Sequence, residues 1–133
     1  MIFALPYPPT ANLYWRVWRG RAVKSAEARN YQKRVKLLAK ASLGARVEPL
    51  RGPVRVEVSV YRPAKRGDLD NTLKVILDAL RGIAYGDDAQ VVEILARRND
   101  DAANPRAIVT VAAVANGDAA EARIAAEVER MGS

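Results

Sequence analysis

The chain has 133 residues, of which half are hydrophobic and 28% are charged, a composition typical of one folded globular domain. It has no cysteine and no histidine, which excludes disulfides, Cys/His zinc sites and catalysis by a Ser-His-Asp or Cys-His arrangement. If the chain is an enzyme, its chemistry must use carboxylates, Lys, Arg, Tyr or a hard metal ion.

The net charge of +7 is unevenly distributed. Residues 1–66 hold 15 Lys/Arg and 3 Asp/Glu, whereas residues 67–133 hold 7 and 12. The basic half indicates a polyanionic partner, and we favour nucleic acid over a membrane surface because no basic segment has the broad apolar face of an interfacial helix. Residues 1–9 lack the features of a signal peptide, and no apolar run approaches the ~20 residues of a membrane span. We therefore expect a cytoplasmic, nucleoid-associated protein without a membrane partner.

The first predicted elements are short. An apolar run over residues 2–5 is stopped by Pro6. Residues 14–23 are aromatic, β-branched and basic around Arg19-Gly20, which predicts a hairpin or an extended stretch with a turn at these two residues.

A long helix follows, with Ser25 as its N-cap, and it runs to about Leu43 before Gly44 stops it. One stripe of this helix is mostly apolar and is expected to face the core: Tyr31, Val35, Leu38 and Ser42. A second stripe, the cation row, holds four basic residues: Arg29, Lys33, Lys36 and Lys40. A solvated face and a surface for the phosphate backbone are both open interpretations of the cation row.

The middle of the chain predicts a strand, a loop and a second helix. Residues 53–61 alternate between apolar and polar or small side chains, which is the period of a half-buried strand. Residues 62–67 form a basic loop. The leucine and isoleucine residues between Leu69 and Leu80 recur at helical spacing, and Gly82 ends the helix.

A turn at residues 85–88 and two strands, around 90–98 and 106–114, come next, and residues 116–133 are expected to form a C-terminal helical extension. The fold class we predict is α/β (α+β), as one compact domain over residues 1–133. It has a small mixed sheet packed with about three helices.

Two acidic segments carry the possible chemistry. Asp68 and Asp70 flank Leu69 at the start of the second helix, and Lys74 lies one turn after Asp70. Asp87 and Asp88 lie in the turn before the next strand. If that strand pairs with the strand at 53–61, the helix start and the turn can meet at one end of the sheet. Converging carboxylates repel one another unless a hard divalent ion lies between them, which favours a magnesium site.

Such a site would suit phosphodiester hydrolysis, with Lys74 neutralising charge on the phosphorane or orienting the attacking water. Two alternatives stay open. In the first, the acids serve only as a helix cap and a turn in a non-catalytic basic module that binds branched or single-stranded nucleic acid. The segment 68–72 also fits the D-x-D-x-T pattern of aspartate-nucleophile phosphatases, but that motif normally follows directly on a buried strand and belongs to a larger sheet.

Four segments resemble, in order, the landmarks of RusA-type Holliday-junction resolvases: LPYPPTANLYW (5–15), KSAEAR (24–29), RGDLDNTLKVILDAL (66–80) and GDDAQVV (86–92). The resemblance covers most of residues 2–115. Its most specific part is D-L-D-N-x-x-K followed about a dozen residues later by D-D-x-Q-V.

The resemblance implies a homodimeric endodeoxyribonuclease that depends on Mg²⁺, with Mn²⁺ as a substitute. Such an enzyme resolves four-way DNA junctions by paired, symmetric nicks in recombination and repair, and the family suggests a phage or prophage origin. Carried over by position, the metal ligands are Asp68, Asp70 and Asp88, with Asp87 beside the site, and Lys74 matches the catalytic lysine.

We expect the basic residues around these segments to contact DNA phosphates: Arg16, Arg19, Arg21, Lys24, the cation row, Lys65 and Arg66. Tyr14, Trp15 and Trp18 lie among the first of these arginines, a mixture suited to stacking on unpaired bases near a crossover. Packing in the core or against a second protomer is the alternative for these aromatic residues, and we favour it for Trp15.

Overall fold

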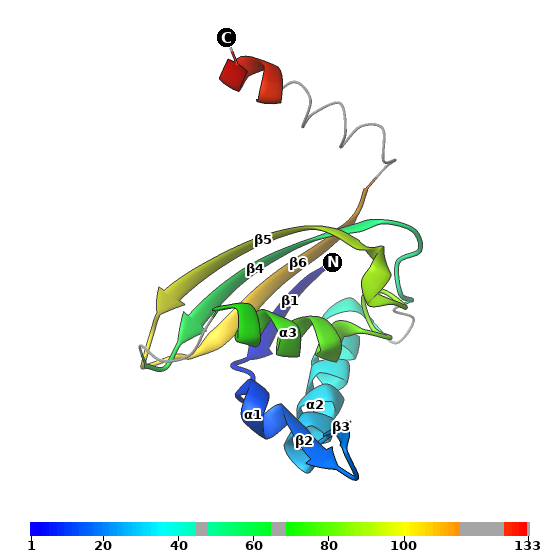
Figure 1. Cartoon of the computed structure of the whole chain (residues 1–133), viewed down its shortest axis with the longest axis vertical. Helices are drawn as coiled ribbons and strands as arrows, with labels where there is room; N and C mark the ends of the chain where they lie inside the picture. The colour runs from blue at the N-terminus through cyan, green and yellow to red at the C-terminus, as the bar shows by residue number, and fades with distance from the viewer. Residues whose placement is uncertain (45–47, 65–68, 115–126, 133) are drawn as a thin grey trace.

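The computed structural model describes residues 1–44, 48–64, 69–114 and 127–132. A four-stranded mixed sheet has the order β1-β6-β4-β5, and β2 and β3 form a separate two-stranded hairpin. Figure 1 shows α2 and α3 on the same side of the four-stranded sheet. The elements, in chain order, are β1 (Ile2–Pro6), α1 (Ala11–Tyr14), β2 (Trp15–Trp18), β3 (Arg21–Lys24), α2 (Ala26–Leu43), β4 (Val54–Arg62), α3 (Leu69–Leu80), the 3-10 helix η1 (Asp88–Gln90), β5 (Val91–Asp100) and β6 (Arg106–Ala113).

This architecture confirms the predicted α+β fold with a small mixed sheet. Residues 127–132 are helical, and most of the predicted C-terminal extension lies outside the described residues. Within the described ranges, no helix combines the length and the apolar character needed to cross a membrane.

The alternating apolar and polar residues that predicted β4 lie on the two opposite faces of this strand. Val54, Val56, Val58 and Val60 are at most 1% exposed and face the helices, whereas the residues between them are partly exposed. Strand β6 repeats the pattern on its buried residues Ala107, Val109 and Val111. A sheet with antiparallel pairs can leave one face to water, and within the described residues α2 and α3 both lie on the opposite face (Figure 1).

The first part of the chain folds as its turn and cap residues predict. Arg19 and Gly20 both have positive φ, 49° and 73°, as the two central residues of a tight hairpin turn require. The Ser25 side chain accepts a hydrogen bond from the Ala28 backbone N–H at 3.1 Å, which caps α2, and Gly44 ends the helix with φ 91°.

The buried stripe of α2 differs in part from the predicted one. Tyr31 and Val35 are buried as predicted, but Ala28 and Ala39 complete the stripe while Leu38 is only partly buried and Ser42 is exposed. The small alanine side chains allow the helix to pack closely on the sheet. The four-residue helix α1, which Thr10 caps, was not predicted because so short an element has no periodicity to recognise.

Helix α3 connects strands β4 and β5, which are parallel neighbours in the sheet. Strands β4 and β5 pair in parallel from Val54↔Val91 to Arg62↔Asp100. The strand before β5 in the sequence is therefore its neighbour in the sheet, as expected. Because both strands run in the same direction, α3 must run back along the sheet, from the carboxyl end of β4 to the amino end of β5.

Candidate active site and nucleic-acid interface

The first acidic segment lies at the start of α3. Asp70 is the second residue of the helix, and its side chain is exposed. Lys74 is exposed one turn further along, on the side of the helix that carries Asp70. Asp68 lies outside the described residues, so Asp70 is the one member of the expected Asp68/Asp70 ligand pair whose position is described.

The second acidic segment forms a closed local structure before β5. The Asp87 carboxylate accepts a hydrogen bond from the Ala89 N–H at 3.1 Å, and the Gln90 side-chain oxygen accepts one from the Asp87 N–H at 3.0 Å. The Gln90 amide also donates to the Leu50 and Gly52 carbonyls, at 2.8 and 2.9 Å. The Asp88 side chain is exposed and has no hydrogen bond or ion pair with any described residue, while its backbone carbonyl accepts a hydrogen bond from the Val91 N–H. Asp87 thus acts as a cap, whereas the Asp88 carboxylate is available to a ligand.

The two acidic segments lie at opposite ends of α3 (Figure 1). The 12 residues of the helix span about 18 Å. The expectation that the helix start and the turn meet at one end of the sheet is therefore wrong within one protomer, because the parallel pairing of β4 and β5 forces α3 to separate them. Within the described part of the chain, no group of three or more Asp/Glu residues is placed to hold a metal ion.

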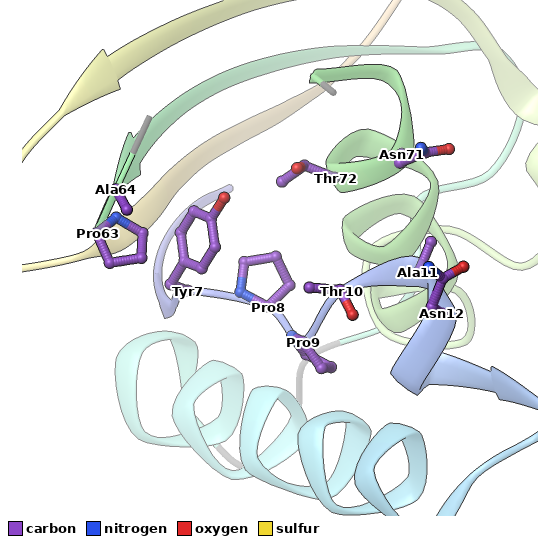
Figure 2. Close-up of a pocket in the computed structure, with 10 residues that line it drawn as sticks. All are labelled: Tyr7, Pro8, Pro9, Thr10, Ala11, Asn12, Pro63, Ala64, Asn71 and Thr72. Atoms are coloured by element: carbon purple, nitrogen blue, oxygen red, sulfur yellow. The ribbon is translucent and has the colours of Figure 1, made fainter. Parts of the chain in front are cut away.

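A cavity of about 410 Å³ lies beside the first turn of α3. Figure 2 shows the Tyr7 ring and Pro8 below this turn, with Thr72 and Asn71 projecting from the helix and Pro63 and Ala64 at the end of β4. The residues that line the cavity come from three segments: Tyr7, Pro8, Pro9, Thr10, Ala11 and Asn12; Pro63 and Ala64; Asn71 and Thr72.

A polar network that the sequence analysis missed is centred on Asp78. The Tyr14 hydroxyl donates a hydrogen bond to its Oδ2, Gln32 Nε2 donates at 3.1 Å, and Lys24 Nζ lies 3.0 Å away. The Asp78 side chain is 15% exposed. The network joins α1, β3 and α2 to α3. The signal available in the sequence was a lone acid between apolar Leu77 and Ala79.

Three tyrosines, called the buried tyrosines below, have hydroxyl pKa values raised above the usual value: Tyr14, Tyr31 and Tyr85. Burial is the main cause for each pKa, and the hydrogen bond to Asp78 adds to the shift of Tyr14. Their hydroxyls remain neutral donors. That of Tyr31 donates to the Pro6 carbonyl at 2.8 Å and that of Tyr85 to the Leu77 carbonyl at 2.6 Å.

The aromatic residues of the first hairpin divide into packed and exposed ones. Tyr14 is fully buried, so it is not available to stack on a base. Trp15 packs edge-to-face on Tyr14 with ring centroids 4.6 Å apart, in agreement with the packing role that we favoured. Trp18 is 58% exposed, and the Arg19 guanidinium lies over its ring at 4.4 Å. Of the three, only Trp18 presents its ring to a ligand.

The basic residues also differ in availability. All four members of the cation row are exposed, as are Arg19 and Arg21. Arg16 is exposed and lies 3.8 Å from Glu27. Lys24 is paired with Asp78, which argues against the predicted phosphate contact by its ammonium. Lys65 and Arg66 lie outside the described residues.

Three residues of the cation row line a groove together with Arg81, which follows α3 and which the sequence analysis did not single out. The groove also has Gln32, Ala79, Gly82 and Ile83 in its walls. Four cations along one groove can neutralise several phosphates of a nucleic-acid backbone.

Comparisons with known proteins identify the family of this chain. The family model of endodeoxyribonuclease RusA matches residues 6–112. The chain is 39% identical over 94 residues to the crossover junction endodeoxyribonuclease of Enterobacteria phage 82, and 39% identical over 92 residues to those of Escherichia coli K12 and Shigella sonnei. Each match covers 67% of this chain and 74% of the relative. The chain belongs to the RusA family of endodeoxyribonucleases.

Proposed function

We propose that this chain is a metal-dependent endonuclease that resolves four-way DNA junctions by paired nicks, in recombination and repair. Its relatives are named crossover junction endodeoxyribonucleases, and nucleases of the RusA family depend on a metal ion. The observation that carries the proposal is the pair of exposed, unpartnered carboxylates at the two ends of α3, within the described residues, on a protein with a basic groove.

The donor set fits a hard cation. Asp70 and Asp88 are exposed carboxylates without an ion pair to any described residue, and Asp68 precedes the first of them by two residues in the sequence. Oxygen ligands of this kind favour Mg²⁺, with Mn²⁺ as a substitute. One protomer cannot bring Asp70 and Asp88 to one ion, because α3 separates them by most of its length. The site therefore needs a second protomer.

A two-fold dimer along β5 would bring the acids together. Strand β5 is at an edge of the sheet, and it exposes Val92 (58%), Ile94 (46%) and Leu95 (42%). Antiparallel pairing of two β5 strands also makes the two α3 helices antiparallel. Asp70 then lies at the end of the sheet that holds the partner's Asp88, twice per dimer. Pairing centred on Leu95 would further oppose Glu93 with the partner's Arg97.

In this arrangement different residues of the chain bind the metal ion, stabilise charge and bind the DNA backbone. Asp70, Asp88 and Asp68 hold the metal ion, which when bound polarises the phosphodiester and activates water. Lys74, one turn from Asp70, stabilises negative charge on the phosphoryl oxygens in the transition state. The basic groove holds the flanking backbone and so fixes the scissile strand. Two sites related by a two-fold axis match a junction that requires two opposed cuts.

A labelled four-way junction and a linear duplex of matching sequence test the activity. Wild type in Mg²⁺ should nick only the junction, in opposed strands, and should not cut in EDTA. Asp70→Asn should abolish cutting in Mg²⁺ while keeping or raising junction affinity in Ca²⁺, since it removes a negative charge beside the phosphate. Tight binding by wild type without nicking in Mg²⁺ or Mn²⁺ would support the binding module instead.

Mixing two inactive variants tests the shared site. In a dimer of one Asp70→Asn and one Asp88→Asn protomer, a site shared between protomers leaves one intact copy, so the mixture should produce single nicks. A site contained within one protomer leaves no intact copy, and the mixture would stay inactive. Asp87→Asn is the matched control, because Asn is also a good N-cap and should preserve both η1 and activity.

A further inference from the structure

The hairpin of β2 and β3 projects from the body of the molecule. It forms a two-stranded sheet of its own, and Figure 1 shows it at the start of α2, away from the four-stranded sheet. Strand β5, which the proposed dimer uses, belongs to that other sheet. The tip of the hairpin, residues 18–21, is formed by the tight turn at Arg19 and Gly20. The tip therefore stands where a large ligand can reach it.

One face of the hairpin combines an aromatic ring with cations. Successive side chains of a strand point to opposite faces, and directly paired residues share a face. The indole of Trp18 is 58% exposed, and the Arg19 guanidinium lies 4.4 Å from the centre of its ring. Two further exposed arginines lie on the face that carries this indole. The pairing of β2 with β3 gives this face four residues: Arg16, Trp18, Arg21 and Val23.

The base of the hairpin is held on the helices. The Ser25 backbone N–H donates a hydrogen bond to the Tyr14 carbonyl at 2.9 Å, which closes the end of the hairpin opposite the tip. On the other face of the hairpin, Trp15 packs on the Tyr14 ring, and the Lys24 ammonium lies 3.0 Å from the Asp78 carboxylate of α3. A tip supported in this way loses little conformational freedom when it binds a ligand.

The hairpin continues the positive charge of the groove at α2. Arg29, the first member of the cation row, donates a hydrogen bond through its guanidinium to the Lys24 carbonyl at the end of β3, at 3.4 Å. Arg29 also lines the groove, together with Lys33, Lys36 and Arg81. A phosphate backbone bound in the groove can therefore continue onto the hairpin. This continuity of charge favours nucleic acid over a protein as the partner of the exposed indole.

We propose that the hairpin tip is a wedge that inserts at the branch point of a DNA junction. The Trp18 ring stacks on a base there, and Arg16, Arg19 and Arg21 contact the converging phosphates. In a continuous duplex, neighbouring bases cover both faces of every base. In the open form of a four-way junction, the base pairs that flank the branch have an uncovered face on which an indole can stack. The inference rests on the proposed endonuclease function and assigns to Trp18 the selection of DNA shape.

Binding to a four-way junction and to a linear duplex of matching sequence, both in Ca²⁺, tests the wedge. Trp18→Ala should lower junction affinity about tenfold, which is in the range of one base–aromatic stack, and should change duplex affinity less than about twofold. Trp18→Phe keeps an aromatic ring and should stay within about threefold of wild type for the junction. Val17→Ala removes a more exposed apolar side chain on the other face of the hairpin. This matched control should leave both affinities unchanged.

Indole emission provides a second measurement. The chain has two tryptophans, so Trp18→Phe leaves Trp15 as the one emitting indole. Because stacking on a base quenches an indole, wild-type emission should fall when the junction binds and should not fall with the duplex. The emission of Trp18→Phe should stay constant with both DNAs.

An unchanged preference of Trp18→Ala for the junction, or an equal loss of affinity for both DNAs, would overturn the wedge while leaving the endonuclease intact. A changed oligomeric state of Trp18→Ala would assign the ring to a protein contact and would overturn the wedge as well. A wild type that neither prefers the junction nor cuts it in Mg²⁺ would overturn both the wedge and the proposed function.

Discussion

Replacing Asp78 by Ala should destabilise the protein by about 1–4 kcal/mol. Tyr14 is fully buried, and its hydroxyl would lose its acceptor, which costs about 1–3 kcal/mol. The ion pair with Lys24 adds less than about 1 kcal/mol, because the lysine side chain is 37% exposed and is solvated when released. The Gln32 amide is partly exposed and can also bond to water, so it contributes little.

Urea unfolding of wild type, two single variants and the double variant measures the contribution of the buried Tyr14–Asp78 hydrogen bond to the free energy of unfolding. Tyr14→Phe removes the donor, Asp78→Ala removes the acceptor, and the double variant removes both. Because the single Asp78→Ala change leaves a buried hydroxyl unpaired and the double variant does not, the two effects should be coupled by about 1 kcal/mol or more. Glu27→Ala is the matched control, since its ion pair with Arg16 lies at the surface, with side chains 47% and 60% exposed, and should contribute little.

Additive effects of the two changes would refute this reasoning, as would a cost of Asp78→Ala equal to that of the control. The network also joins the basic hairpin to α3, so Asp78→Ala should weaken junction binding in Ca²⁺ at temperatures where the protein is still folded. A loss of stability with unchanged affinity would show that the hairpin keeps its position without Asp78.

Two further outcomes follow from the buried tyrosines and the cation row. The raised pKa values of the buried tyrosines mean that the stability they provide is complete below pH 10 and is lost as pH rises through the folded-state pKa values. Urea unfolding should show a free energy that falls above pH 10 by up to about 1.4 kcal/mol per pH unit for each tyrosine, and a flat profile to pH 12 would contradict this. Joint replacement of Lys33, Lys36 and Lys40 by Ala should lower the slope of log affinity against log salt by about 1 to 3 in junction-binding titrations. An unchanged slope would place the DNA elsewhere.

The elements that the sequence predicted well are those with local signals. The alternation from 53 to 61, the leucine spacing of α3 and the Ser25 and Gly44 caps each depend on neighbours a few residues apart. The Arg19-Gly20 turn is of the same kind. In each of these cases the local preference and the tertiary fold agree, and the structure confirms the prediction.

The features that escaped prediction depend on long-range geometry. Parallel and antiparallel pairing of β4 with β5 leave the same sequence pattern, yet only the parallel pairing places Asp70 and Asp88 at opposite ends of α3. Asp78 gathers donors from 46 to 64 residues away in sequence, which no local pattern reveals. The cavity likewise joins Tyr7 to Asn71 across most of the first half of the chain.

The length of α3 gives the proposed dimer a functional consequence. Metal–oxygen distances for Mg²⁺ are about 2.1 Å, so carboxylates at opposite ends of a helix about 18 Å long cannot share one ion. A monomer would then hold two incomplete halves of a site, and a dimer would complete both halves at once. A nuclease built in this way cannot nick one strand as an isolated protomer, which protects a junction from a single unpaired cut. The separation that contradicts the sequence-based expectation for one protomer is thus the feature that would couple cleavage to the symmetry of the substrate.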